Sequence, residues 1–170
     1  DLAGALQCFQ RAVQDDPDDG LYWLNLSVCE HKTGAQGDAL EHARRAFALD
    51  RTCEPAAFHL GELLRLQLQM DELLAVLDQL EQTGERAARW HLLRGLALMH
   101  SHQWQHASES LLAAMAGSAD DRDTRIKATQ QLGHCFLSMR EHAEAGICYR
   151  MLVDMGPLSI GSALYAAHSS

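Results

Sequence analysis

Small and apolar residues recur along the chain in columns with a constant spacing. One column advances by 34 residues at each step and consists of Ala5, Ala39, Leu73 and Ala107. A second column advances by the same 34 residues and consists of Ser27, Gly61 and Gly95. A fixed period of this length is typical of repeat arrays, in which each repeat buries its apolar face against its neighbours. The pattern therefore predicts a stack of similar units.

The composition of each repeat favours helix. Leu and Ala are abundant, β-branched residues are few, and the whole chain contains only three prolines and 12 glycines. The predicted helices span residues 1–15, 20–33, 36–50, 54–67, 71–83, 87–100, 104–116, 123–139, 142–155 and 159–168, with boundaries uncertain by about two to four residues. Short turns join these helices in pairs, so we expect the chain to begin on a second helix and to end on a first helix.

The period is broken once. The next members of the two columns are Gly133 and Ala145, each 38 residues after its predecessor, so four extra residues lie between them. The polar stretch 117–127 is the natural place for this insertion. Its residues are compatible with a longer loop and with one added turn on the following helix, and the sequence does not separate the two.

Together, the columns resemble the tetratricopeptide repeat family. The family pattern has Trp, Leu-Gly and Tyr on a first helix, and Ala, an aromatic residue and Ala on a second helix. The residues that match it are Ala5, Phe9, Ala12, Pro17, Trp23, Leu26, Gly34, Ala39, Ala46, Leu60, Gly61, Leu64, Gly95, Trp104, Ala107, Ala114, Leu132, Gly133, Phe136, Ala145, Tyr149 and Pro157. The chain departs from it at Ser27, Leu73, Leu77, Leu80 and Arg94.

This resemblance implies an all-α fold, an α-α superhelix in which antiparallel helix hairpins stack into a right-handed solenoid. A single array is predicted over residues 1–170. Its parts would be a second helix in 1–19, repeats at 20–53, 54–87, 88–121 and 122–159, and the first helix of a further repeat in 160–170. The fourth repeat would carry the four-residue insertion.

Composition excludes several classes of partner. The net charge is −9, and the 14 basic residues are scattered among 23 acidic ones, so no basic stripe is available for nucleic acid. No uninterrupted apolar stretch of about 18 residues is present to insert into a membrane. The five cysteines are odd in number and widely spaced, which favours free core thiols in a reducing, cytoplasmic compartment.

No motif for chemistry is found, and we expect no catalytic residue, cofactor or metal. His100, His102 and His106 are the densest group of histidines, but they straddle an expected turn, so convergence on one metal ion is not assured. The pairs Cys29 with His31 and His134 with Cys135 are too close along a helix to act as nucleophile and base. A polar turn and core thiols are the simpler interpretations.

In this family the first helices line the concave face that holds peptides, and the register indicates which residues point to it here. They are Leu24, Val28, His31, Lys32, Phe58, Glu62, Arg65, Leu92, Leu96, Met99, Lys127, Gln130 and His134. The set is apolar in its middle and polar at its ends, which suits a peptide with apolar anchors and carboxylates. Each apolar member has about even odds of packing between helices instead.

The leading hypothesis is therefore a protein–protein interaction scaffold without chemistry of its own, which binds a peptide or helical segment in the concave groove. One alternative is the recognition region of a larger enzyme, of glycosyltransferase, sulfotransferase or hydroxylase type. Another is a chaperone that binds an aggregation-prone client. The final stretch has almost no charge and resembles an unfinished cap, so self-association through uncapped terminal helices is a further expectation.

Overall fold

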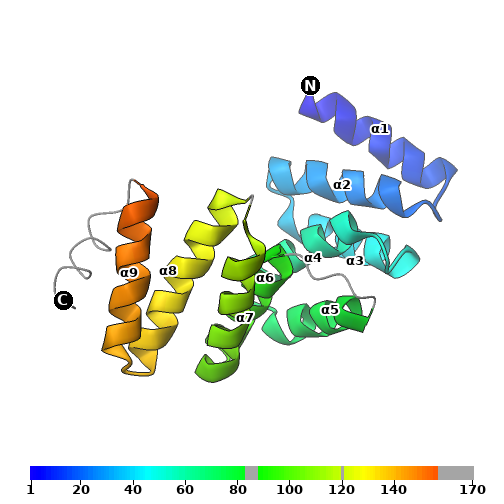
Figure 1. The fold of residues 1–170 in the computed structure, drawn as a ribbon. Helices are drawn as coiled ribbons and strands as arrows, with labels where there is room; N and C mark the ends of the chain where they lie inside the picture. The colour runs from blue at the N-terminus through cyan, green and yellow to red at the C-terminus, as the bar shows by residue number, and fades with distance from the viewer. Residues whose placement is uncertain (83–87, 120, 157–170) are drawn as a thin grey trace. The chain divides into compact units, whose positions relative to one another are not determined.

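The structure, a computed structural model of the full chain, describes residues 1–82, 88–119 and 121–156. All of the regular secondary structure in these residues is α-helical (Figure 1). The chain divides into two compact units, Asp1–Glu85 and Arg86–Ser170, and each is described by itself. The all-α prediction is confirmed for the part of the chain that the structure describes.

The first unit contains helices α1 to α5. Their bounds are α1 Leu2–Asp15, α2 Gly20–Thr33, α3 Gln36–Leu49, α4 Glu54–Leu66 and α5 Met70–Gln82. Helix α2 packs on α3 and α4 packs on α5, as the predicted hairpins require, and α1 packs on α2 as a second helix would. Helices α2 and α4 also touch each other, so the first helices of two consecutive repeats lie side by side.

The second unit repeats this arrangement with four described helices. Their bounds are α6 Ala88–His100, α7 Trp104–Gly117, α8 Arg122–Ser138 and α9 His142–Met155. The hairpins are α6 with α7 and α8 with α9, and the first helices α6 and α8 contact each other. The predicted helix at 159–168 lies outside the described residues.

The four-residue insertion lengthens a helix. Helix α8 has 17 residues, whereas α2 has 14 and α4 and α6 have 13 each. The connection before α8 covers residues 118–121 and is as long as those at 16–19 and 50–53. The inserted residues therefore form an extra turn at the start of α8, which settles the alternative that the sequence left open.

Two glycines allow the hairpins of the second unit to close tightly. A Cβ atom on Gly95 of α6 would lie 2.6 Å from Cγ of Leu111 on α7, a side chain that is fully buried. A Cβ atom on Gly133 of α8 would lie 3.0 Å from Cζ of Tyr149 on α9. The missing side chain on one helix thus makes room for a large side chain on its partner, which is the close packing that helix pairs need.

Helix α8 begins with a strong N-cap. Asp121 accepts hydrogen bonds from the backbone N–H of Thr124 (3.1 Å) and from its hydroxyl group (2.7 Å), which satisfies one of the free donors of the first turn. Arg89 of α6 donates to the same carboxylate at 3.2 Å. These donors, with Thr124 as the largest contributor and Arg89 next, lower the pKa of Asp121 from 3.8 to about 2. The cap thereby joins the first helices of two consecutive repeats.

We predict that Gly95→Ala destabilises the protein by about 1–3 kcal/mol, because the new methyl group has to displace the buried Leu111 side chain. Gly37→Ala is the matched control, since Gly37 lies in the first turn of α3 and a Cβ atom there meets nothing within 4 Å. The control should leave stability unchanged or raise it by up to about 1 kcal/mol. Urea unfolding followed by circular dichroism measures both, and equal effects of the two substitutions would contradict the close-approach argument.

We also predict that acid weakens the α8 cap in a defined window. Because the folded-state pKa of Asp121 lies below its ordinary value, its contribution to stability is complete above pH 3.8 and is lost as the pH falls towards 2. A carboxyl ¹³C titration of Asp121 should give a midpoint near 2. Thr124→Val and Arg89→Ala should each move that midpoint towards 3.8, and an unmoved midpoint in both variants would show that these donors do not act on Asp121.

Candidate functional site

The residues predicted to bind a partner lie on two separate faces, one in each unit. We define the unit-1 wall as the α2 and α4 residues Leu24, Val28, His31, Lys32, Phe58, Glu62 and Arg65. We define the unit-2 wall as the α6 and α8 residues Leu92, Leu96, Met99, Lys127, Gln130 and His134. Within each helix these residues are spaced by three, four or seven or eight positions, so they share one side of the helix.

The unit-1 wall combines core and surface positions. Leu24 is buried and packs with Ala46 and Ala56, which shows that it fills the space between consecutive repeats. Val28 packs against the same cluster but remains partly exposed, as does Phe58 on α4. Lys32 is exposed in the last turn of α2, where the helix dipole favours a cation. The wall thus offers a partner two half-buried apolar side chains and a cation.

The charges of α4 are paired within the wall. Arg65 donates through Nε and Nη2 to one carboxylate oxygen of Glu62, at 3.0 and 2.9 Å, across one turn of the helix. Both side chains are about one-third exposed, so the pair contributes little to stability but neutralises both charges locally. Lys32 has no charged partner among the described residues. It is therefore the cation of this wall with the most capacity to bind a carboxylate.

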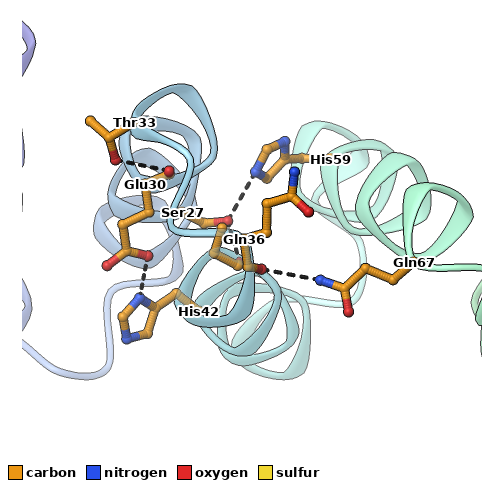
Figure 2. A network of polar contacts seen from close by, with 8 residues as sticks. Ser27, Glu30, Thr33, Gln36, His42, His59 and Gln67 are labelled. Atoms are coloured by element: carbon orange, nitrogen blue, oxygen red, sulfur yellow. Dashed lines mark hydrogen bonds and ion pairs between the residues drawn. The ribbon is translucent and has the colours of Figure 1, made fainter.

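A chain of hydrogen bonds behind the wall joins three helices through a fully buried serine (Figure 2). The hydroxyl group of Ser27 on α2 donates to the carbonyl oxygen of Ala39 on α3 at 2.6 Å. Its oxygen lies 2.9 Å from Nε2 of His59 on α4. Because the only hydroxyl proton is already used, Nε2 of His59 must carry the proton and donate it. This fixes the tautomer of His59 and holds α4 against the α2–α3 hairpin.

His59 also contacts a second histidine of the wall. The rings of His31 and His59 meet edge to face with centroids 5.9 Å apart. Burial, and next the nearby His31, lower the pKa of His59 below its ordinary value of 6.5. Nδ1 of His31 is buried without a hydrogen-bond partner, so a proton on that nitrogen would find no acceptor. Both rings are therefore suited to the neutral state at this contact.

A buried carboxylate lies on the opposite side of α2. Glu30 is only 5% exposed, and its Oε2 lies 2.6 Å from Nδ1 of His42 on α3 (Figure 2). The His42 ring in turn packs on Trp23, with ring centroids 5.2 Å apart. A buried carboxylate needs such a partner, because an unpaired one would be strongly destabilising. This pair fastens α2 to α3 and belongs to the interior of the repeat.

The unit-2 wall is apolar on α6 and polar on α8. Leu92 is buried, whereas Leu96 and Met99 are partly exposed beside it. Lys127 is exposed and forms a loose ion pair with Asp123, with Nζ 3.6 Å from Oδ2. Gln130 is half-buried and His134 is exposed. Of the thirteen predicted residues, Leu24 and Leu92 therefore have little surface for a partner, and the other eleven remain accessible.

The described residues offer no arrangement suited to chemistry. They contain no group of three or more His, Cys, Asp or Glu side chains placed to hold a metal ion. Burial raises the pKa of the Cys148 thiol to about 11 and that of Cys135 above its ordinary value, so neither is a ready thiolate. His102 packs edge to face on Trp104 at the α6–α7 turn, with centroids 5.3 Å apart. None of the helices in the described part is both long and apolar enough to cross a membrane.

Sequence reasoning missed the polar contacts behind the wall. Ser27 stands in the glycine column of the repeat, and this departure was the one available signal that its hydroxyl group has a structural task. The partners His59 and Ala39 lie 32 and 12 residues away, and no local pattern joins them. The Glu30–His42 pair likewise depends on the packing of α2 on α3.

Comparison with known proteins supports the repeat interpretation. A family model described as tetratricopeptide repeat matches residues 1–52. A search of curated protein sequences gives no match. Among solved structures, the chain is similar to the tetratricopeptide repeat protein TTC0263 of Thermus thermophilus, with 24% identity and a TM-score of 0.70 over 99% of this chain and 90% of that one.

Two further structures show the same fold. YrrB, described as a tetratricopeptide repeat protein with an unusual peptide-binding site, is 18% identical with a TM-score of 0.78, over 97% of this chain and 83% of that one. MamA from Desulfovibrio magneticus RS-1 is 19% identical with a TM-score of 0.80, over 91% and 85%. By the sequence match over residues 1–52 and by the fold of its described residues, this chain belongs to the tetratricopeptide repeat family.

Proposed function

We propose that this protein is an interaction scaffold that binds a peptide or helical segment of a partner protein on the walls formed by its first helices. The observation that carries the proposal is that each unit places two first helices side by side and leaves eleven of the thirteen wall residues accessible. Apolar and charged side chains alternate on these walls, as they do at binding surfaces that anchor apolar residues within a polar surround. The family membership supports the same class of function.

The unit-1 wall fits a ligand with an apolar residue close to a carboxylate. Phe58 and Val28 offer apolar contact area, and Lys32 offers an unpaired cation near them on α2. Arg65 is already held by Glu62, so it can bind a carboxylate only by exchanging partners. The recognition of acidic groups by this unit therefore depends mainly on Lys32.

The unit-2 wall fits a ligand that is apolar at one end and polar at the other. Leu96 and Met99 on α6 can receive an aliphatic side chain, and the flexible thioether of Met99 adapts to different shapes. Gln130 and His134 on α8 provide hydrogen-bonding groups that a peptide backbone can use. Lys127 adds a cation whose pairing with Asp123 is loose and solvent-exposed.

We predict that reversing three wall cations together, with Lys32→Glu, Arg65→Glu and Lys127→Glu, weakens peptide binding by about tenfold, roughly 1.4 kcal/mol. The probe is a peptide selected from a random displayed library on the full chain, and its affinity is measured by fluorescence anisotropy. The thermal unfolding curve should hardly change, because the pairs that are lost lie at the surface.

The matched control reverses three exposed arginines away from the walls, Arg11, Arg51 and Arg140, to Glu, which changes the net charge by the same amount. The control variant should bind the peptide within about twofold of the unmodified chain, because charges beyond a Debye length of about 8 Å are largely screened. If both triple variants lose affinity equally, the effect is one of net charge and the walls are not the binding site.

We further predict that the unit-1 wall is destabilised by mild acid through His59. The folded state lowers the pKa of His59, so the unfolded state binds the proton more tightly. Stability from the neutral ring is thus complete above pH 6.5 and is lost as the pH falls through 6.5 towards the folded-state pKa. His59→Gln keeps a donor for Ser27 but cannot titrate. Its urea midpoint should therefore vary less between pH 7.5 and about 5 than that of the unmodified chain.

The control for this experiment is His106→Gln, since His106 is exposed on α7 and belongs to the other unit. That variant should keep the pH dependence of the unmodified chain. A His59→Gln variant with the same pH dependence as His106→Gln would contradict the assignment to His59.

A further inference from the structure

Helix α9 has an outward side that is apolar and uncovered. Its inner side packs on α8 through Ala145, Gly146, Cys148, Tyr149 and Leu152, all of them buried. On the opposite side Ala143, Ile147 and Met151 follow one another at intervals of four residues, which aligns them along the helix. Ile147 is 51% exposed and Met151 is 36% exposed. We call this side of the helix the α9 outer stripe.

The outer stripe is specific to α9. The residues that correspond to Ile147 in the preceding second helices are Glu109, Ala75 and Glu41. The residues that correspond to Met151 are Ala113, Gln79 and Arg45. Large apolar side chains therefore stand at positions that are charged, polar or small in the other repeats. Exposed apolar area that is confined to one face of one helix marks a contact surface better than scattered exposed residues do.

Two charged residues flank the stripe without partners. Glu144 and Arg150 are exposed, and neither contacts an oppositely charged side chain among the described residues. The corresponding surface of α3 differs, because Arg44 there pairs with Glu72 at 2.6 Å and Arg45 pairs with Asp18 at 3.7 Å. The charges of α9 are thus free to pair with another molecule.

The order of these residues is self-complementary. If a second α9 lies antiparallel to the first with Ile147 at the two-fold axis, each residue faces the one equally far beyond Ile147 on the other copy. Ile147 then faces Ile147, Ala143 faces Met151 and Glu144 faces Arg150, since each pair of numbers sums to twice 147. A small residue meets a large one, and an anion meets a cation twice by symmetry.

We propose that two copies of this chain associate through their α9 outer stripes in this antiparallel register. Each copy contributes a single helix, which is less than the roughly 800 Å² per partner of a stable interface. The association is therefore weak and reversible, with a Kd on the order of tens to hundreds of micromolar. The stripe points away from α8, so the wall residues on α8 stay accessible and a partner with two binding segments gains avidity.

A charge-swap series tests the register. Glu144→Arg places two arginines against each other at both symmetric positions, and Arg150→Glu places two glutamates there. Each single variant should weaken association, measured by sedimentation equilibrium of the full chain, by about tenfold, because two pairs become repulsive at once. The double variant restores opposite charges and should return the Kd to within about threefold of the original. Glu109→Arg, the matched change on α7, should have no effect.

A cross-linking experiment tests the same register without changing charge. In a Cys8→Ser background, Ile147→Cys should form a disulfide-linked dimer under mild oxidation, because residue 147 faces its own copy. Ala143→Cys is the control, since the two copies of residue 143 would lie about 12 Å apart along the axis, too far for a disulfide. The Cys8→Ser parent alone should remain uncross-linked.

Three results would overturn the proposal. They are a chain that stays monomeric up to about 1 mM, a double swap that fails to restore association, and equal cross-linking at residues 143 and 147. Circular dichroism of each variant shows whether it is folded, and the cysteine variants separate a lost contact from a lost fold. A monomeric chain that still binds its selected peptide would end this proposal while leaving the proposed function intact.

Discussion

The close approach of paired helices is the constraint on which the rest of this structure depends. Gly95 and Gly133 carry no side chain, and the space is taken by Leu111 and Tyr149 of the partner helix. That arrangement sets the distance within each hairpin of the second unit, and so the distance at which the next first helix can pack. The wall residues are placed by this spacing, because each belongs to a helix whose inner side is fixed against its partner.

The fold could be predicted from the sequence because its determinants are local and repeated. A column such as Gly61 and Gly95, 34 residues apart, fixes the register of a whole repeat, so the described helices begin and end within about two residues of their expected positions. The insertion before α8 could not be assigned, since a polar stretch containing Asp121 and Asp123 is equally compatible with a loop and with the first turn of a helix.

The candidate site was predictable in outline only. Helical spacing places the right side of each first helix, but it does not say how deeply each residue lies between neighbouring helices. Leu24 and Leu92 are buried for this reason, although they share a side with exposed Lys32 and half-buried Met99. The hydrogen bonds from Ser27 to Ala39 and His59 depend on distances across three helices, and they escape any reading of the sequence. The binding role of the walls stays a prediction.

The added turn of α8 shows how such an array can change length without losing function. The extra residues extend the helix backwards from its start, so Lys127, Gln130 and His134 keep their angular positions. The same four residues placed in mid-helix would turn everything on one side of them by about 40° relative to the other side. The lengthened end instead acquires a new contact, since Asp121 meets Arg89 of the preceding repeat at 3.2 Å. Variation at helix starts is thus evolutionarily inexpensive, and it can even tighten the join between consecutive repeats.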